Sequence, residues 1–243
     1  MRLHLEGDWP GPVALQRGWA RAAARPWNDA TPMAHLRVER GGPGFLEECA
    51  AALLGLPGVT GVLSPPLLAD ARPPWEQAGF APHARLVLMR RELDGLPAPG
   101  HAVAPGDLRD LADALQVDRA AFDPFWRFDR TALVEAFHAT PERAIHLVRR
   151  PGGGLAAFAV TGRSGSQAYL QRVAVDPAWQ ARGIGRSLVR TAAAWARAAG
   201  ASALLLNTPE QNASAAALYA SEGFRTVTRD LAVMGRMAQD LRV

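Results

Sequence analysis

At 243 residues the chain is long for one ordinary domain and short for two large ones, so we expect one domain with a substantial appendage. Hydrophobic residues make up 49% of it, and no run approaches the ~18 uncharged apolar residues that a membrane span requires. The net charge of +4 comes from arginines that are scattered along the sequence. We therefore expect neither a membrane nor a nucleic-acid partner.

The N-terminus and the single cysteine indicate the cellular compartment and the kinds of site to expect. Met1 to Asp8 contain acidic residues and no apolar stretch, which argues against a secretory signal and favours a cytoplasmic protein. Cys49 lies in an apolar stretch and is expected to be a small buried core residue. One cysteine cannot form an internal disulfide or a cysteine metal cluster, and we expect no metal.

The first ninety residues contain a few regular segments, namely strand-like residues 35–39, helix-like residues 45–54, and strand-like residues 59–63 and 85–90. Composition then shifts at 93–100, where glycines and two prolines follow a strand-like segment. We place a domain boundary there, which divides the chain into residues 1–95 and 96–243.

The second region alternates strands and helices. Residues 101–103 are expected to form a strand, followed by a helix with Leu108, Leu111, Ala112 and Leu115 on one face. Further segments follow in chain order: a helix over 131–139, strands over 145–148, 155–160 and 169–175, a helix over 183–199, a strand over 204–206, a helix over 212–221 and a strand over 226–234.

A glycine-containing loop joins the strand at 169–175 to the long helix. It reads Gln180-Ala181-Arg182-Gly183-Ile184-Gly185-Arg186. A helix N-terminus has unpaired N–H groups and a favourable dipole for an anion, and residues without side chains let a phosphate approach the backbone. On local grounds alone, a structural turn with incidental glycines is an equally good interpretation.

The surroundings of this loop decide between the two interpretations. The order strand, Q-x-x-G-x-G, helix, apolar strand, and then the segment from Asn212 to Phe224 closely resembles the GNAT superfamily of acetyl-CoA-dependent N-acetyltransferases. The resemblance covers about residues 96–237. It implies an α/β (α+β) fold with a central mixed, mostly antiparallel sheet flanked by helices.

The resemblance also implies roles for individual residues. The strand before the loop would pair with the pantetheine arm of acetyl-CoA through Val173, Ala174 and Val175, and the N–H of Val175 would polarise the thioester carbonyl. The pyrophosphate would lie on Gln180, Ala181, Arg182, Gly183, Ile184, Gly185 and Arg186. Asn212 would meet the cofactor, and Tyr219 would be the general acid for the leaving thiolate; simple packing of Tyr219 is the alternative.

One position departs from the family pattern. Many similar enzymes carry a glutamate at the end of the strand after the long helix, where it removes the amine proton, but here that position is Asn207. A carboxamide cannot accept a proton at neutral pH. Either the amine arrives neutral or another residue accepts its proton, and the candidates are Glu210, Asp123, Asp129 and His138.

The acceptor site in this family is built largely by the helices after the first strand. In that place the sequence interleaves aromatic residues with charges, and we single out Phe122, Asp123, Trp126 and Asp129 as candidate substrate residues. The alternative is that the aromatic residues pack and the charged residues are solvated.

The N-terminal region resembles a degenerate copy of the same half-fold. Trp75 stands four residues before Gly79, as Tyr219 stands four before Gly223. The copy lacks the Q-x-x-G-x-G loop, and an indole has no acidic proton for a thiolate. We expect a smaller, non-catalytic GNAT-like unit that closes the sheet, walls the acceptor cleft or forms a homodimer contact; an unrelated appendage is the alternative.

The sequence thus predicts an acetyl-CoA-dependent N-acetyltransferase that transfers an acetyl group to a primary amine of a small molecule, peptide or protein by direct attack on the thioester. The alternative is a non-catalytic acyl-CoA sensor or assembly module. Acetyl-CoA is the expected co-substrate of the enzyme, and an acyl-CoA is the expected ligand of the sensor.

Overall fold

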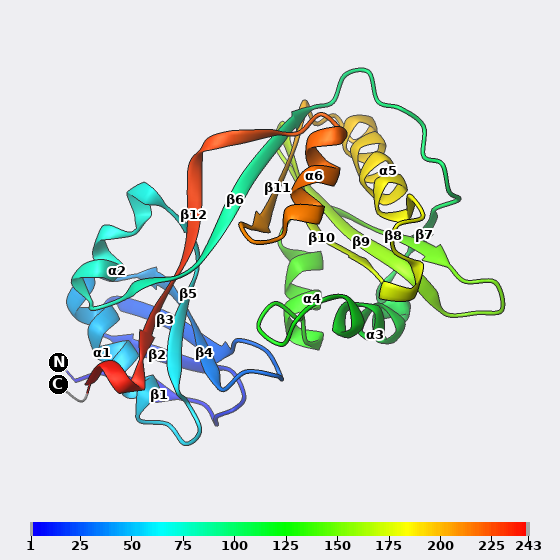
Figure 1. Cartoon of the computed structure of the whole chain (residues 1–243). Coiled ribbons are helices and arrows are strands. Elements are labelled where there is room, and N and C mark those ends of the chain that lie inside the picture. Colours follow the sequence, from blue (N-terminus) through cyan, green and yellow to red (C-terminus); the bar gives the residue numbers. More distant parts are fainter. Residues whose placement is uncertain (1, 242–243) are drawn as a thin grey trace. The chain divides into compact units, whose positions relative to one another are not determined.

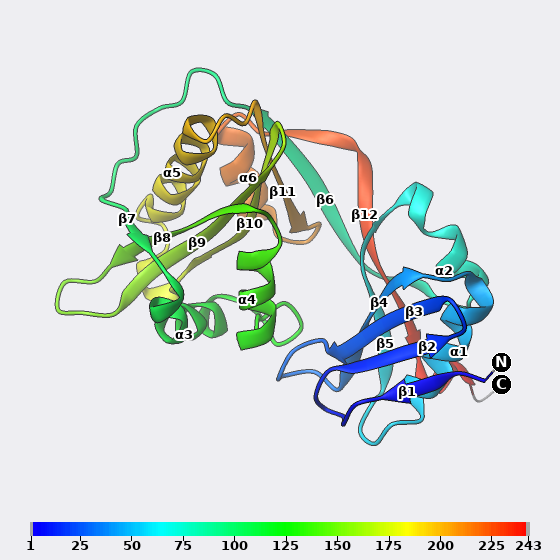
Figure 2. The same ribbon diagram turned by 180° about the vertical axis from the view of Figure 1, so that it is seen from behind.

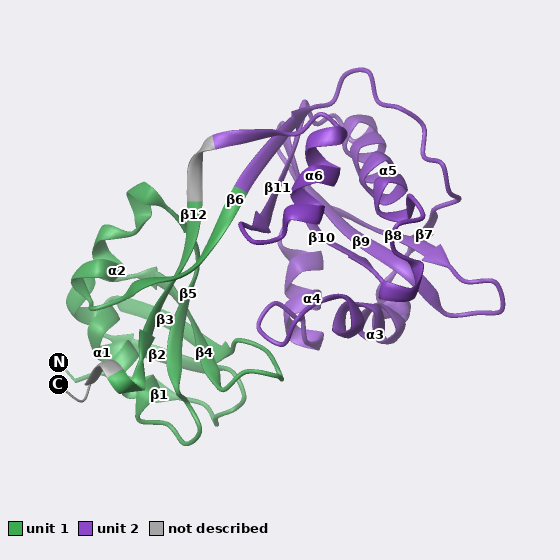
Figure 3. Cartoon of the chain, viewed as in Figure 1, with its two compact units in different colours: residues 1–87, 228–243 green, residues 88–227 purple. Residues whose placement is uncertain are grey.

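A computed structural model describes residues 2–241, without the side chains of residues 228–230 and 240–241. The chain forms two compact units (Figure 3): unit 1 contains residues 1–87 and 228–243, and unit 2 contains residues 88–227. The domain boundary expected near residue 95 stays a prediction. Among the described residues, no helix is long and apolar enough to cross a membrane.

Unit 1 has the strand order β1-β2-β3-β4-β5-β12. Its elements are β1 (His4–Glu6), β2 (Val13–Arg17), β3 (Ala20–Pro26), β4 (Met33–Arg40), α1 (Pro43–Leu54), β5 (Gly61–Leu68), η1 (Ala69–Ala71) and α2 (Pro73–Gln77). β6 (Ala81–Glu92) and β12 (Arg225–Met237) each contribute residues to both units, and η4 (Ala238–Leu241) ends the described chain.

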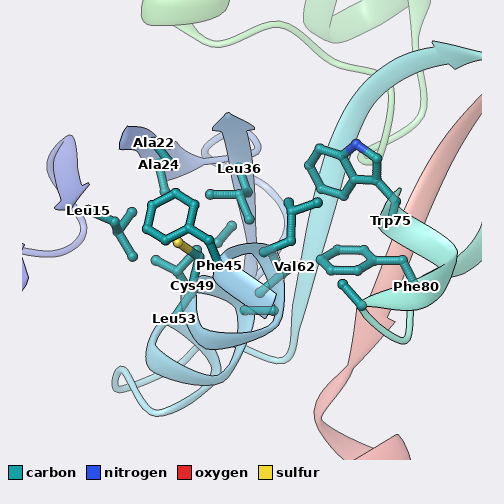
Figure 4. Close-up of a cluster of buried hydrophobic side chains, with 14 of the residues drawn as sticks. Leu15, Ala22, Ala24, Leu36, Phe45, Cys49, Leu53, Val62, Trp75 and Phe80 are labelled. Carbon is teal, nitrogen blue, oxygen red and sulfur yellow. The ribbon is translucent and has the colours of Figure 1, made fainter. Parts of the chain in front are cut away.

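One hydrophobic cluster holds unit 1 together (Figure 4). Phe45, Cys49 and Leu53 lie on one side of α1 and pack against the inward side chains of β2, β3 and β4. Strand β3 reaches this cluster through Ala20, Ala22 and Ala24, which alternate with outward residues as a half-buried strand requires. Cys49 is fully buried, which confirms the expected core cysteine, and this burial raises the pKa of its thiol to about 12.

Unit 2 is a mixed, mostly antiparallel sheet with the order β6-β11-β10-β9-β8-β7 (Figures 1 and 2). Its elements are β7 (Ala104–Gly106), η2 (Leu108–Asp110), α3 (Leu111–Ala121), α4 (Arg130–His138), β8 (Glu142–Arg149), β9 (Leu155–Ser164), β10 (Gln167–Val175), η3 (Pro177–Trp179), α5 (Ile184–Ala198), β11 (Ala203–Pro209) and α6 (Ala213–Ser221). The α/β fold expected from the sequence is confirmed.

Helix α3 corrects one expectation about the core. The buried residues of α3 are Leu111, Ala114, Val117 and Asp118, whereas Leu108 lies before the helix and is 40% exposed. The strand expected at 101–103 was placed too early, because β7 begins at Ala104, where it pairs with β8. The sequence also gave no indication of β1, β2 and β3.

The two units repeat the same strand pairing. In unit 1, β4 runs parallel to β5 with partners from Met33–Gly61 to His35–Leu63. In unit 2, β10 runs parallel to β11 with partners from Gln167–Ala203 to Tyr169–Leu205. Each described parallel pairing covers only the first three residues of its strands, so both units contain a pair of strands that separates after a short contact.

The turn after the last helix of each unit is repeated as well. In unit 1 the N–H of Phe80 donates to the carbonyl of Trp75 at 3.0 Å, and in unit 2 the N–H of Phe224 donates to that of Tyr219 at 3.0 Å. Their rings also touch, with centroids 4.9 Å apart in the first pair and 5.7 Å in the second. The N-terminal unit therefore repeats the local structure of unit 2, with tryptophan in place of tyrosine.

Candidate active site

Strand β10 provides the open edge of the candidate site. Its antiparallel pairing with β9 continues to Val175, whereas its described pairing with β11 ends at Tyr169. The residues predicted to meet pantetheine, Val173 to Val175, therefore lie beyond the described contact with β11. Backbone N–H and C=O groups at such an edge are available to an extended ligand.

The loop after β10 leads into the N-terminus of α5. Gly183 is the N-cap of α5 and has φ +79°, in the left-handed region where a glycine has no steric penalty. Ala181 has φ +60°, which is uncommon for a residue with a side chain. The first N–H groups of α5 have no helical acceptor four residues earlier. The local geometry thus fits an anion at this end of the helix.

Contacts fix this loop against its neighbours. Gln180 Nε2 donates to the carbonyl of Val175 at 3.0 Å, which ties the loop to the end of β10. The ring Nε2 of His101 lies 2.7 Å from the carbonyl oxygen of Arg182. A Cβ atom at Gly185 would lie 3.4 Å from Leu218 and 3.6 Å from Val175. The loop, the end of β10 and helix α6 therefore meet at Gly185.

The two arginines of the loop have protein partners. Arg182 Nη2 donates to the carbonyl of Ala178 at 3.1 Å, and its Cζ lies 4.9 Å from the ring centroid of Trp179. Arg186 Nε lies 2.9 Å from Glu222 Oε1. The predicted contribution of Arg186 to a phosphate therefore competes with an existing ion pair.

Glu222 is a buried carboxylate that sequence reasoning missed. Its side chain is 2% exposed, and Arg190 reaches it at 2.8 Å and Arg186 at 2.9 Å, with Arg91 at 3.9 Å. These arginines come from α5 and β6, so the ion pairs attach the end of α6 to both elements. These ion pairs could not be predicted from the residues around Glu222, because its partners are distant in the chain.

Helix α6 positions the two predicted residues that follow β11. Asn212 is its N-cap, and the side-chain Oδ1 accepts the N–H of Ala215 at 3.2 Å. That leaves the amide Nδ2 as the donor that Asn212 could offer a cofactor. Tyr219 is 8% exposed, and burial raises the pKa of its hydroxyl to about 12, an effect that the charge of Arg172 opposes.

The candidate substrate residues divide into two groups. Phe122 packs its ring on the guanidinium of Arg172, with 3.5 Å between the ring centroid and Cζ. Asp123 accepts the N–H groups of Phe125 at 2.9 Å and Trp126 at 3.2 Å, and Asp129 caps α4 by accepting the N–H of Ala132 at 2.7 Å. Both aspartates thus hold backbone groups of the α3–α4 region.

The α3–α4 region is organised by an ion pair that the sequence analysis missed. Asp118 is fully buried on α3, and Arg172 of β10 binds it through Nε at 2.6 Å and Nη2 at 2.8 Å. The sequence contained one signal for it. Asp118 stands seven residues after Leu111 and four after Ala114, so a charged residue lies on the apolar face of the helix.

The candidates for the proton acceptor lie in different places. Asn207 lies in β11 with an exposed side chain, and Glu210 and His138 are also exposed. Asp123 and Asp129 accept backbone N–H groups, as described above. Among the described residues, no group of three or more His, Cys, Asp or Glu side chains could hold a metal ion.

Comparisons with known proteins identify the family of this chain. The model of the acetyltransferase (GNAT) family matches residues 111–224. The chain is 37% identical over 87 residues to the ribosomal protein bS18-alanine N-acetyltransferase of Escherichia coli K12, which covers 36% of this chain and 59% of that protein. It is 34% identical over 119 residues to the protein of the same name from Salmonella typhimurium LT2, covering 49% of this chain and 77% of that protein.

A solved structure extends the likeness to both units. The putative GNAT acetyltransferase of Novosphingobium aromaticivorans DSM 12444 has a TM-score of 0.60 and 24% identity, covering 91% of this chain and 90% of that chain. At this identity the likeness concerns the fold, and its coverage includes the N-terminal half. The match to the family model and the 34% identity over most of the Salmonella relative together show that this chain belongs to the GNAT family of acetyltransferases.

Proposed function

We propose that the protein is an acetyl-CoA-dependent N-acetyltransferase that acetylates a primary amine of a small molecule, peptide or protein. One observation carries the proposal: the glycine N-cap of α5, Gly183 at φ +79°, follows the strand that separates from β11. A helix N-terminus suits the pyrophosphate, and the edge of β10 suits the amides of pantetheine. Gly185 fits the same role, because its lack of a side chain leaves the backbone beside Val175 and Leu218 accessible to a phosphate.

Different residues of the chain have different roles in the acetyl transfer. Bound acetyl-CoA supplies the acyl group as a thioester; the acceptor nitrogen takes that group, the C–S bond breaks, and CoA leaves as a thiol. Val175 offers its N–H to the carbonyl, and Tyr219 offers a hydroxyl hydrogen to the leaving sulfur. The absence of a base at Asn207 requires an amine that arrives neutral or a proton acceptor elsewhere, such as Glu210.

The named relatives direct the choice of acceptor. Those proteins are N-acetyltransferases of an alanine in ribosomal protein bS18, so a peptide with N-terminal alanine belongs first in the panel of amines to test. Small amines without a peptide complete the panel. The reaction is monitored by measuring the free thiol of CoA that is released when the acetyl group is transferred.

Substitution of the loop tests the cofactor site. Gly183→Val should abolish acetyl-CoA binding measured by calorimetry, because a β-branched side chain at positive φ distorts the N-terminus of α5. The matched control is Gly165→Val, at a hairpin glycine with φ +61° and no atom within 4 Å of an added Cβ. Intact binding by Gly183→Val would exclude this loop as the pyrophosphate site.

The alternative function, a non-catalytic acyl-CoA sensor, is favoured by one feature, namely Asn207 in place of a carboxylate. Binding of acetyl-CoA without thiol release across the whole amine panel would support it. Turnover with any amine of the panel excludes it.

A further inference from the structure

The guanidinium of Arg172 is held rigidly. The rings of Phe122 and Phe128 pack against it, with centroids 3.5 and 3.9 Å from Cζ. Nε and Nη2 bind the buried carboxylate of Asp118, and Nη2 also donates to the carbonyl of Trp126 at 2.8 Å. Asp118 in turn accepts the N–H of Phe128 at 2.7 Å. The group is therefore preorganised, and a further hydrogen bond from it requires little additional ordering.

One edge of this guanidinium has no hydrogen-bond partner in the part of the chain that the structure describes. Nη1 carries two N–H groups, and the described residues provide no acceptor for either of them. The side chain of Arg172 is still 9% exposed. Because the rings lie against the group and Asp118 takes its Nε and Nη2 edge, Nη1 is the part of the guanidinium that is left for a ligand.

The position of Arg172 places this edge near the candidate chemistry. Arg172 immediately precedes Val173 and stands three positions before Val175 on the same strand, which is roughly 10 Å of extended backbone. The positive charge of Arg172 also acts to lower the pKa of the Tyr219 hydroxyl, against the larger effect of burial. A donor at this place can bind an atom of the acceptor close to the reacting amine.

The chemistry of the free edge limits what it binds. The ion pair of Arg172 with Asp118 is neutral as a whole, so the edge is better matched to a neutral or singly charged oxygen than to a phosphate dianion. Nη2 is already committed, so the edge cannot form the two-nitrogen fork that grips phosphates. A single carbonyl or carboxylate oxygen fits both conditions.

We propose that Arg172 is a specificity-determining residue, whose Nη1 donates to the carbonyl oxygen of the acyl group attached to the carbon that carries the reactive amine. The acceptor class is then an α-amino acyl compound, which includes the N-terminus of a peptide and a free amino acid. This inference rests on the proposed acetyltransferase function and narrows its acceptor. Simple amines that lack the neighbouring oxygen are poor acceptors in this account.

A paired substitution tests the role without leaving a buried charge unpaired. In the variant Arg172→Met with Asp118→Asn, the carboxamide can still accept the N–H of Phe128, while the Nη1 donor is lost. A second variant, Arg172→Lys, keeps the positive charge but loses the planar group. The matched control is Arg163→Met with Glu142→Gln, which removes a different ion pair of unit 2, on β9 and β8. Circular dichroism and thermal unfolding verify that each variant is folded.

Three acceptors are compared: alaninamide, alanine and isopropylamine, which is a branched amine without the acyl oxygen. In the paired variant, kcat/KM for alaninamide or alanine should fall about 10- to 100-fold, the range for one hydrogen bond from a charged group. For isopropylamine it should change less than about threefold, and the control variant should leave all ratios unchanged. For each amine, the kcat/KM of the variant is divided by the kcat/KM of the wild type. This ratio cancels the difference in basicity among the amines.

The outcomes separate this inference from the proposed function. Equal losses for all three acceptors, or no loss for any, would overturn the inference while leaving the acetyltransferase function intact. If no amine is turned over, binding of alaninamide to the protein with CoA present is measured by calorimetry. Saturable binding that is lost in the paired variant supports the inference even then, and no binding to the wild type overturns it.

Discussion

The proposed role of Tyr219 leads to a quantitative prediction for Tyr219→Phe. The hydroxyl is buried, and its pKa is raised to about 12. An ordinary thiol has a pKa of about 8.5, so proton transfer from Tyr219 to a thiolate crosses a gap of roughly 3.5 pKa units, or about 5 kcal/mol. Full transfer from this hydroxyl is therefore uphill. Its favourable contribution is a hydrogen bond to the sulfur while negative charge develops there.

The size of the effect follows from that hydrogen bond. A hydrogen bond to a charged group contributes about 1.5 to 3 kcal/mol, which corresponds to roughly a 10- to 150-fold change in rate. We expect kcat of Tyr219→Phe to fall within that range and acetyl-CoA affinity to stay unchanged. Because Tyr219 remains protonated through neutral pH, the kcat profile of the wild type should show no decline from this residue below pH 10.

The assay is thiol release with the best amine of the panel, measured between pH 6 and about pH 10. The control is Tyr169→Phe, which removes the hydroxyl of the other tyrosine, a donor to Gln167 at 3.1 Å. A loss above roughly 1,000-fold, or a decline near pH 8 to 9 that disappears in Tyr219→Phe, would refute the hydrogen-bond account and indicate full proton transfer. An unchanged kcat would remove Tyr219 from the mechanism.

Three further predictions concern the scaffold. Burial lowers the pKa of His146 from 6.5 to about 4, so the unfolded chain binds a proton at this residue more readily than the folded chain does. The free energy of unfolding should therefore fall as the pH drops from about 6.5 to 4, by at most roughly 3 kcal/mol. Urea unfolding should show this loss in the wild type and in the exposed-site control His138→Leu, and a similar loss in His146→Leu would contradict it. Deleting residues 228–243 removes Leu231 to Met234 of β12 from the core, so unit 1 should lose its cooperative unfolding transition; a retained transition would show that β12 is dispensable. Asp129→Ala should destabilise the protein by about 1 kcal/mol through the lost cap of α4, and Asp129→Asn by less, as chemical denaturation can measure.

The part of the fold that the sequence predicted has strong local signals. The helix expected at 183–199 is α5, which begins at Ile184 after a glycine N-cap, and the strands expected at 145–148 and 155–160 lie within β8 and β9. Strands β1, β2 and β3 had no such signal. The inward residues of β3 are alanines, and so is the exposed Ala23, so the strand shows little apolar–polar alternation. Alanine also has low β-propensity, and the inward face is buried only because α1 packs on it.

The candidate site was predictable only where function depends on the backbone. The glycine loop is a contiguous stretch, so its backbone conformation depends mostly on residues that are neighbours in the sequence. The pair of Asp118 and Arg172 joins residues 54 positions apart, and Glu222 gathers arginines from two other elements. Such pairs depend on which faces of separate elements meet. The sequence left two interpretations open for Phe122, a substrate residue or a packing residue, and its ring packs with that of Phe128 against the guanidinium of Arg172.

Unit 1 provides an internal comparison for the functional argument. It has the same short parallel contact between strands as unit 2, so the separation of those strands is a feature of the fold and does not by itself indicate a cofactor site. Helix α1 begins with Pro43, which lacks an N–H, and Phe45 and Trp75 are buried in the core of that unit. An anion would find fewer donors there. The assignment of acetyl-CoA to unit 2 therefore depends on Gly183 and Gly185, and substitution at Gly183 is the test that bears most directly on it.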